Sequence, residues 1–317
     1  MMEVLHAGLC DLVMGAARPG FGVLGVPAGG ASDPAALAAA NALVGNLAAA
    51  AGLEITLAGP TLRFPLGATV ALTGAPFMAT RSCGAPVVWN ETLVLAPGET
   101  LTIGRVASGC RCWLSVQGGL MVPQVLGSYS TFLPAGFGGH MGRALQAGDA
   151  LAVGAQTGEV HVLRATPPDT GYPHAPLRVV AGPQAGGFED AGLASFFSSP
   201  YQITAATDRR GLRLAGPVVT YAGGELPSQG VLPGAIQVPP DGQPIILGWD
   251  GPVTGGYPVI AVVVTADRAT LAQLKPGDTV QFVTIEIERA RALASAAWLI
   301  LETAVDRSSP FGMLHEY

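Results

Sequence analysis

Short apolar runs separated by glycine and proline make up most of the chain, and the clearest of them lie in its last third. Residues 234–238 and 244–249 are apolar or alternating runs on either side of Pro239-Pro240-Asp241-Gly242, where proline and glycine favour a tight connection. This pattern predicts a β-hairpin, followed by a glycine-rich turn at 254–258 and a buried strand at 259–265. A rigid hairpin that leads into a polar loop is suited to present a small binding site.

The same reasoning predicts many short strands and few helices elsewhere. We expect a first strand at 3–13, a series at 70–73, 87–89, 93–95, 100–103 and 112–116, and later strands at 177–181 and 279–287. Helices are expected at 34–44, after a cap at Ser32 or Asp33, around 189–197, and at 286–304, where Arg289 and Arg291 face outward. The sequence therefore predicts a mainly β fold with a few short helices.

The length of 317 residues is enough for two domains. A polar, proline-rich stretch around 166–176 is the best candidate for a boundary between them. We therefore expect an N-terminal β-barrel lobe at 1–165 and a C-terminal lobe with a terminal helix at 177–317.

The net charge of −6 and the lack of a lysine or arginine cluster argue against a nucleic-acid partner. Only 12% of residues are charged and 49% are hydrophobic, yet no run approaches the roughly 20 apolar residues of a membrane span. Burial of part of the surface against other chains explains this composition, so we expect an obligate complex. The N-terminus has no signal-peptide pattern, which favours a cytoplasmic protein.

The numbers and positions of cysteine, histidine and lysine argue against disulfides, a metal site, a P-loop and a biotin attachment site. Four cysteines, Cys10, Cys83, Cys110 and Cys112, show no disulfide framework and are expected to be small buried hydrophobes. Five scattered histidines without an H-E-x-x-H motif indicate no metal site. Lys275 is the only lysine, and its Gln-Leu-Lys-Pro-Gly-Asp context is neither a P-loop nor a biotin attachment site. Any ATP or biotin is therefore expected on a partner.

Two further polar loops could form a binding pocket. One carries Ser128, Ser130, His140 and Arg143 among glycines, but a serine hydrolase is disfavoured because no G-x-S-x-G motif surrounds either serine and no orienting acid can be identified from the sequence. In the other, Asp208 stands close to several arginines and could orient Arg209 or Arg213 by a charge-assisted hydrogen bond. These arginines could bind a carboxylate or phosphate, or form a structural ion pair.

Several motifs together resemble one known family. They include Gly25-Val26-Pro27, Gly30, Asp33, Ala40-Asn41, Asp208-Arg209, Gly234-Ala235-Ile236-Gln237-Val238-Pro239, Asp241-Gly242, Asp250 and Gly255-Gly256-Tyr257-Pro258. The resemblance spans roughly residues 3–285 and identifies the chain as a member of the allophanate hydrolase subunit 2 family, also called the biotin-dependent carboxyltransferase or KipA-like family. It implies two cyclophilin-like β-barrel lobes and pairing with a KipI-like (PxpB-like) subunit 1, together with a PxpA-like subunit.

The resemblance leaves three functions open. The first is that of the C subunit (PxpC-like) in a 5-oxoprolinase-like complex, which hydrolyses 5-oxoproline to glutamate with ATP. The second is a carboxyltransferase lobe that accepts a carboxyl group from biotin carried on another protein. The third is a non-catalytic regulatory binding module, as in the KipA branch.

Site residues follow from the same motifs and loops. Catalytic roles are expected for Asp33, Asp250 and Arg209. Substrate-binding roles are expected for Asn41, Ser130, His140, Arg143, Arg213, Thr254, Gly255, Gly256 and Tyr257. No pair stands at a spacing that assigns a proton donor or acceptor.

Three loops depart from the family pattern by losing polar residues. In the first loop the family pattern is Gln-Asp-x-Gly-Arg, and Met14, Gly15 and Ala17 stand in place of its Gln, Asp and Gly before Arg18. Tyr129 and Phe132 replace an arginine and an aspartate, and Pro252-Val253 replaces Gln-Thr. These changes lead to the hypothesis of a divergent paralogue with an altered substrate or reduced catalytic capacity.

Overall fold

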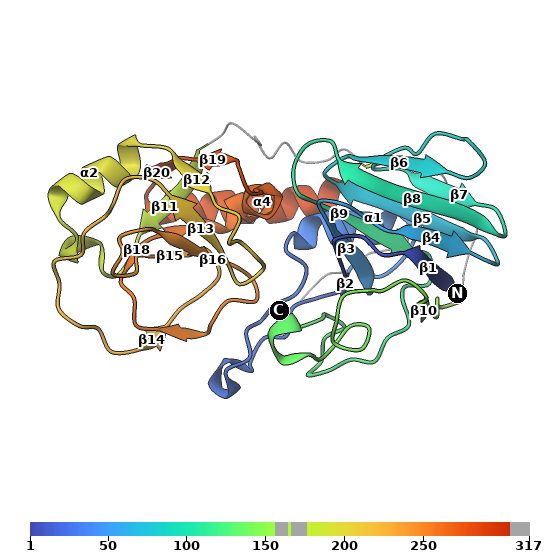
Figure 1. The fold of residues 1–317 in the computed structure, drawn as a ribbon, viewed down its shortest axis with the longest axis horizontal. Helices are drawn as coiled ribbons and strands as arrows, with labels where there is room; N and C mark the ends of the chain where they lie inside the picture. Colours follow the sequence, from blue (N-terminus) through green and yellow to red (C-terminus); the bar gives the residue numbers. More distant parts are fainter. Residues whose placement is uncertain (156–163, 166–175, 305–317) are drawn as a thin grey trace. The chain divides into compact units, whose positions relative to one another are not determined.

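The computed structural model describes residues 1–155, 164–165 and 176–304. The chain divides into two compact units (Figure 1). Unit 1 comprises Met1–Ala16, Pro34–Pro168 and Ala296–Tyr317, and unit 2 comprises Ala17–Asp33 and Asp169–Ser295. The expected division at 1–165 and 177–317 differs from these units at two places. Residues 17–33 belong to unit 2, where Arg209 Nη2 donates to Gly30 O, and the end of the C-terminal helix, from Ala296, belongs to unit 1. Most of the proline-rich stretch at 166–176 lies outside the described residues.

Unit 1 contains two antiparallel five-stranded sheets, with strand orders β10-β1-β4-β8-β6 and β2-β3-β9-β5-β7. Its strands are β1 Met2–His6, β2 Cys10–Met14, β3 Gly52–Thr56, β4 Thr61–Phe64, β5 Ala68–Gly74, β6 Phe77–Arg81, β7 Thr92–Leu95, β8 Glu99–Val106, β9 Arg111–Val116 and β10 Ala150–Leu151. The strand expected at 87–89 did not form, whereas β3, β4 and β6 were not predicted.

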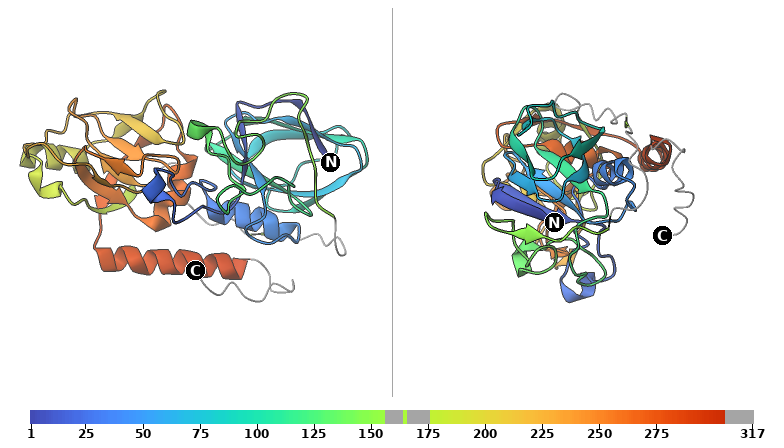
Figure 2. Two further views of the ribbon diagram at one scale, coloured as in Figure 1. Left: turned by 90° about the horizontal axis from the view of Figure 1, so that it is seen from below. Right: turned by 90° about the vertical axis from the view of Figure 1, so that its right-hand side faces the viewer.

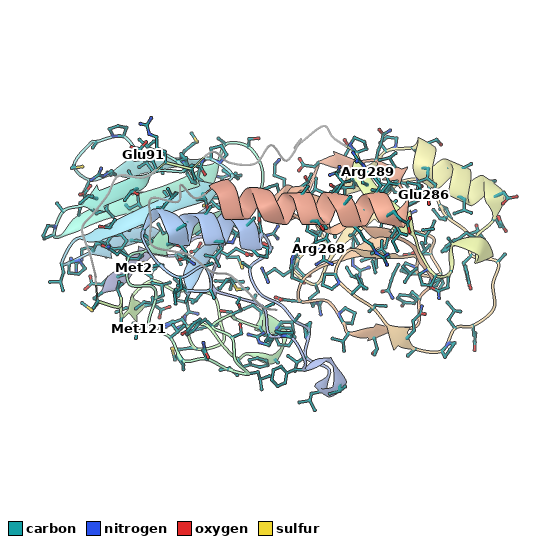
Figure 3. The ribbon with its side chains drawn as sticks, turned by 180° about the vertical axis from the view of Figure 1, so that it is seen from behind. Met2, Glu91, Met121, Arg268, Glu286 and Arg289 are labelled. Carbon is teal, nitrogen blue, oxygen red and sulfur yellow. The ribbon has the colours of Figure 1, made fainter. Side chains whose placement is uncertain are left out.

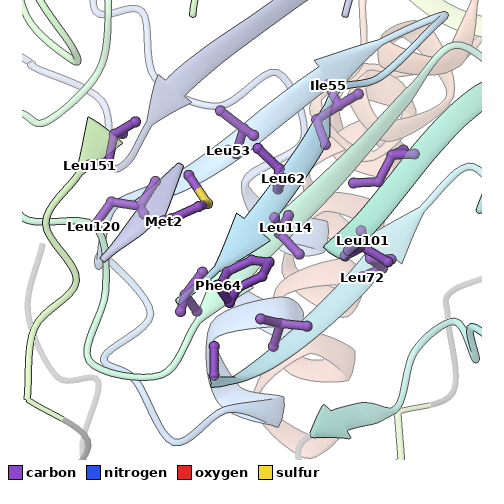
Figure 4. Packing of buried hydrophobic residues seen from close by; sticks show 14 of the residues in the cluster. Met2, Leu53, Ile55, Leu62, Phe64, Leu72, Leu101, Leu114, Leu120 and Leu151 are labelled. Atoms are coloured by element: carbon purple, nitrogen blue, oxygen red, sulfur yellow. The ribbon is translucent and has the colours of Figure 1, made fainter. Parts of the chain in front are cut away.

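The core of unit 1 lies between these two sheets, which face each other (Figure 2). Leu62, Phe64 and Leu101 come from the first sheet, and Leu53 and Leu114 come from the second (Figure 4). Alternate residues of a strand point to opposite faces, so each sheet contributes every second residue to one shared apolar layer.

The single strand expected at 3–13 is two strands in different sheets. The chain turns between them at residues 7–9, where the Gly8 N–H donates to Asp11 Oδ2 at 2.6 Å. An aspartate that accepts a backbone hydrogen bond within its own turn competes with extended pairing. Asp11 itself is 1% exposed, and burial raises the pKa of its carboxyl from 3.8 to about 7, against the smaller lowering effect of the Gly8 hydrogen bond.

Helix α1, Pro34–Leu43, confirms the helix expected at 34–44. Proline suits the first turn of a helix because its missing N–H has no partner there in any case. The helix buries Leu37, Ala40 and Asn41, and Gly45, with φ +71°, follows its end.

Unit 2 is built around an eight-stranded sheet with the order β19-β12-β13-β16-β15-β18-β11-β20. These strands are β11 Leu177–Ala181, β12 Tyr201–Ile203, β13 Gly211–Ala215, β15 Ala235–Gln237, β16 Ile245–Leu247, β18 Val259–Val263, β19 Thr279–Val280 and β20 Phe282–Thr284. A separate ribbon pairs β14, Gln229–Gly230, with β17, Thr254–Gly255. Only Gln281 separates the two edge strands β19 and β20, so the sheet forms a nearly closed barrel.

The predicted hairpin is confirmed. Strands β15 and β16 pair antiparallel, with Ile236 opposite Ile246. In the turn, the Gly242 N–H donates to Pro239 O at 2.9 Å, and Gly242 has the left-handed φ of +73° that the turn chemistry requires.

Helix α2, Asp190–Ser198, covers part of the unit 2 core, where Phe196 stacks on Phe282 with ring centroids 4.7 Å apart. Helix α3 is Arg268–Gln273, and the short 3-10 turns are η1 Gly22–Leu24, η2 Leu133–Ala135, η3 Ala185–Gly187 and η4 Thr265–Asp267. The expected C-terminal helix is α4, Ile287–Ala304, on which Arg289 is exposed (Figure 3). Arg291 is exposed as well.

The predicted mainly β fold is confirmed, and unit 2 has the barrel form. Unit 1 consists of two packed five-stranded sheets, and its expected barrel form stays a prediction, as does the cyclophilin-like architecture of both lobes. None of the four cysteines, all of which lie among the described residues, forms a disulfide. Cys110 and Cys112 are buried as expected, whereas Cys10 is half-buried and Cys83, whose Sγ donates to Glu99 Oε1, is exposed. In the part of the chain that the structure describes, no helix has the length and apolar character to cross a membrane.

Candidate functional site

The centre of the candidate site in unit 2 is an ion pair between Arg209 and Asp250. Strand β13 pairs with β16 so that Gly211 lies opposite Leu247. This register brings Arg209, two positions before β13, next to Asp250, three positions after β16. Two backbone bonds continue this pairing, from Gly248 N to Arg210 O at 2.9 Å and from Asp250 N to Arg209 O at 3.0 Å. Sheet register therefore places the two side chains together.

The pair is bidentate and buried. Arg209 Nε donates to Asp250 Oδ2 at 2.8 Å, and Arg209 Nη2 donates to Asp250 Oδ1 at 3.1 Å. The two side chains are 6% and 1% exposed. A planar guanidinium matches a carboxylate in this two-bond geometry, and such charge-assisted bonds are the strong ones.

A third charged group, Arg18, joins the pair. It is 1% exposed, and burial lowers the pKa of its guanidinium, while the Asp250 carboxylate raises it and the Arg209 guanidinium lowers it further. Two guanidinium groups thus share one carboxylate in the interior of unit 2. We call Arg18, Arg209 and Asp250 the charged triad.

Glycines let a loop lie directly on the charged triad. Arg209 Nη2 also donates to Gly30 O at 2.7 Å. Gly29 has φ +58°, and a side chain there would begin 3.4 Å from Arg18 Nη1 and 3.5 Å from Asp250 Oδ1. Gly30 has φ +87°, and a Cβ would lie 2.9 Å from Ala17 N. The left-handed backbone and the close approach both require glycine.

Asp250 and Arg209 were both predicted as catalytic residues, and the structure pairs them with each other. Asp208, which was expected to orient Arg209 or Arg213, pairs instead with Arg210 at the exposed surface, Nε to Oδ2 at 3.2 Å. Arg213 is exposed on β13, opposite Ile245, and lies outside the triad. Asp33, 5% exposed, directly precedes α1.

Two predicted substrate-binding residues are used by the scaffold of unit 1. Asn41 Nδ2 donates to the carbonyls of Ala48 at 3.1 Å and Ala50 at 3.0 Å, which fixes the chain after α1. Ser130 is fully buried, and its Oγ accepts from Gly15 N at 2.9 Å and donates to Gly15 O at 3.1 Å. Both polar groups therefore hold backbone segments, and the residue types alone did not reveal this.

His140 and Arg143 lie together in unit 1, on a loop with several left-handed residues, and Asp149 orients both. Arg143 Nη1 and Nη2 bind the Asp149 oxygens at 2.7 and 2.8 Å, and His140 Nε2 lies 3.5 Å from Asp149 Oδ1. The hydrogen bonds from Arg143 hold the pKa of Asp149 well below its usual range. Asp149 was not among the predicted site residues; it directly follows Gly148, which has a left-handed φ of +92°.

The predicted residues Thr254, Gly255, Gly256 and Tyr257 form one polar edge of unit 2. Thr254 and Gly255 are β17 itself, and Tyr257, 46% exposed, follows it. Behind them lies Gln237, a buried amide that the sequence analysis passed over because it stands within an apolar strand.

The apolar departures from the family pattern serve packing. Met14 is fully buried, and Phe132 packs on Phe137 with ring centroids 5.4 Å apart. Tyr129 packs against the unit 1 core. Hydrogen-bonding groups at these positions are thus replaced by core contacts.

The site contains carboxylates, guanidiniums and amides but no metal centre: among the described residues, no three His, Cys, Asp or Glu side chains cluster to hold an ion. Lys275 Nζ lies 2.9 Å from Asp278 Oδ1, so the one lysine is part of a turn and does not form a phosphate-binding loop.

Comparison with known proteins gives a consistent result. Residues 24–284 match the family described as carboxyltransferase domain, subdomain A and B. The 5-oxoprolinase C subunit of Escherichia coli (strain K12) is 39% identical over 292 residues, which cover 92% of this chain and 93% of that protein. Urea amidolyase of Saccharomyces cerevisiae is 33% identical over 87% of this chain, but the match spans only 16% of that protein.

A solved structure agrees with these matches. The crystal structure of the K. lactis urea amidolyase superposes with a TM-score of 0.87 and 31% identity, over all of this chain and 20% of that one. With a family match of more than half its length and a relative of nearly equal length, this chain belongs to the carboxyltransferase domain family, subdomain A and B.

Proposed function

We propose that this chain is the C subunit (PxpC-like) of an ATP-dependent 5-oxoprolinase-like complex, which hydrolyses 5-oxoproline to glutamate together with PxpA-like and PxpB-like subunits. The observation that carries this proposal is the match in length. The chain covers 93% of the E. coli 5-oxoprolinase C subunit, whereas it covers 16% of the yeast urea amidolyase.

The residues of this chain support a contributing role. The charged triad supplies a fixed carboxylate and two guanidiniums, and the β17 edge supplies neutral hydrogen-bonding groups. Fixed charges of this kind stabilise charge that develops during a reaction. In the proposed complex, ATP is bound by a partner, since the one lysine here is paired in a turn.

The test is reconstitution. This chain is co-expressed with its proposed PxpA-like and PxpB-like partners, and glutamate release from 5-oxoproline is measured with and without ATP. We expect activity that requires all three chains, with a loss of at least about 100-fold when this chain is omitted, as for loss of a shared catalytic component. An unchanged rate after its omission would contradict the proposal.

The second candidate function is carboxyl transfer from biotin held on another protein. The family description and the superposition with a urea amidolyase favour it. It predicts carboxylation of an acceptor such as urea when a biotin carboxylase and carrier are supplied, and no glutamate release from 5-oxoproline.

A further inference from the structure

The β14–β17 ribbon of unit 2 is a small two-stranded element that covers a buried amide. Gln229 pairs with Gly255 and Gly230 pairs with Thr254, and the Val231 N–H donates to Val253 O at 3.0 Å. Two-stranded ribbons are marginally stable on their own, so contacts with the rest of the unit decide whether this one stays closed.

One such contact is an amide pair at the end of the ribbon. Gln184 Nε2 donates to Gln229 Oε1, and Gln229 Nε2 donates to Gln184 Oε1, both at 3.0 Å. Gln184 Oε1 also accepts from Val259 N at 3.0 Å, which fixes which end of the Gln184 amide is the acceptor. A pair of neutral hydrogen bonds contributes only about 1–3 kcal/mol, so the ribbon can open at low cost.

Beneath the ribbon lies Gln237, which is 4% exposed. Its Nε2 is buried and has no hydrogen-bond partner among the described residues. Leaving a buried donor unsatisfied costs about 1–3 kcal/mol, and such groups in native proteins call for a partner. Gly255 lies so close that a Cβ there would be 2.5 Å from Gln237 Nε2.

An apolar cluster lies on the same strand as Gln237. Gln237 and Ala235 lie on the same face of β15, because alternate strand residues share a face. Ala235 packs with Leu247 and Val259 in a small cluster, against which Val231, next to β14, also packs. A small apolar surface with one polar group is the usual composition of a small-molecule site.

We propose that Gln237 binds the amide of a small ligand, a lactam or ureido group, which enters when the β14–β17 ribbon opens. Such a ligand carries both a carbonyl and an N–H, so it pairs with a side-chain amide at both of its ends. Its apolar ring atoms match Ala235, Leu247 and Val259. This inference rests on the proposed function, in that the lactam of 5-oxoproline is the ligand expected in the active complex.

The first test compares two glycines in the reconstituted complex, Gly255 in the ribbon and Gly224 in an exposed loop. Gly255→Ala places a methyl group against Gln237 Nε2, whereas a Cβ at the exposed Gly224 has no heavy atom within 4 Å beyond its chain neighbours. Neither glycine has a left-handed φ, so φ does not exclude alanine at either position. We expect Gly255→Ala to raise KM for 5-oxoproline about tenfold with little change in kcat, and Gly224→Ala to change KM less than twofold. Equal KM values for the two variants would contradict the proposal that Gln237 binds the ligand.

The second test does not depend on activity. The side-chain amide resonance of Gln237, assigned by its loss in Gln237→Glu, is followed by NMR while 2-pyrrolidinone or 2-imidazolidinone is added to the full chain. We expect this resonance to shift in the wild type and to shift far less in Gly255→Ala, while that of the exposed Gln202 stays in place. A Gln237 resonance that stays unchanged at saturating ligand contradicts the proposal.

The two tests separate the two proposals. If the Gln237 resonance shifts with ligand but the complex releases no glutamate, the Gln237 site is supported and the 5-oxoprolinase function is contradicted. If the complex is active but both glycine variants have the same KM, the 5-oxoprolinase function is supported and the Gln237 site is contradicted.

Discussion

Asp250→Asn is expected to destabilise the protein by about 3–5 kcal/mol, since it removes the one carboxylate shared by two buried guanidiniums. Asparagine keeps the shape of the side chain, so the loss reflects charge. With the carboxylate gone, Arg18 and Arg209 are two like charges in the interior of unit 2, each without its ionic counterpart in the triad.

The number of buried charges that each substitution leaves without a partner predicts the order of the stability losses. Arg209→Gln leaves Asp250 beside Arg18, a neutral remainder, so it should cost less, about 2–3 kcal/mol. Arg210→Gln is the matched control: its pair with Asp208 is exposed at the surface, and the change should stay within about 0.5 kcal/mol. Urea unfolding of the full chain at pH 7, followed by circular dichroism, gives the three free energies. A larger cost for Arg209→Gln than for Asp250→Asn would contradict this account of the triad.

Asp11→Asn is expected to stabilise the protein above pH 7 and to change its pH dependence. In the folded chain the pKa of the Asp11 carboxyl is about 7, against 3.8 for an ordinary aspartate. A raised acid pKa means that the folded state holds the proton more tightly, so the protonated group stabilises at low pH and this stability is lost as pH rises through 7. A shift of three pKa units corresponds to about 4 kcal/mol as an upper bound.

Between pH 6 and pH 8 the wild type should therefore lose about 1.5 kcal/mol through this one group, which Asp11→Asn should not lose. The asparagine Oδ1 can still accept the Gly8 N–H, so the turn is kept. Urea unfolding at the two pH values measures the difference, with Asp241→Asn as a control at an exposed turn. If the stability advantage of Asp11→Asn is the same at pH 6 and pH 8, Asp11 does not titrate as described.

Features fixed by neighbouring residues could be predicted from the sequence. The β15–β16 hairpin followed from two apolar runs and from the proline and glycine of its turn, and helix α1 followed from its apolar spacing and from Pro34. The error at residues 3–13 was also local. An apolar run suggested one strand, but the Asp11 carboxylate caps the Gly8 N–H and turns the chain into the other sheet.

Features fixed by distant residues could not be predicted in this way. Arg209 stands next to Asp208, but its partner Asp250 is 41 residues away and comes close only because β13 pairs with β16. Likewise, the single polar position Gln237 looks like part of an apolar strand until the ribbon above it is seen. Sequence motifs thus identified the relevant loops, while sheet register decided which side chains meet.

Glutamate release by the complex of this chain with its proposed PxpA-like and PxpB-like partners tests the central claim most directly. The complex is supplied with ATP and 5-oxoproline in one reaction, and with ATP, biotin carrier and urea in another. Our account predicts glutamate in the first reaction, dependent on this chain, and no carboxylated product in the second. Carboxylation of urea without glutamate release would contradict it and assign the chain to carboxyl transfer.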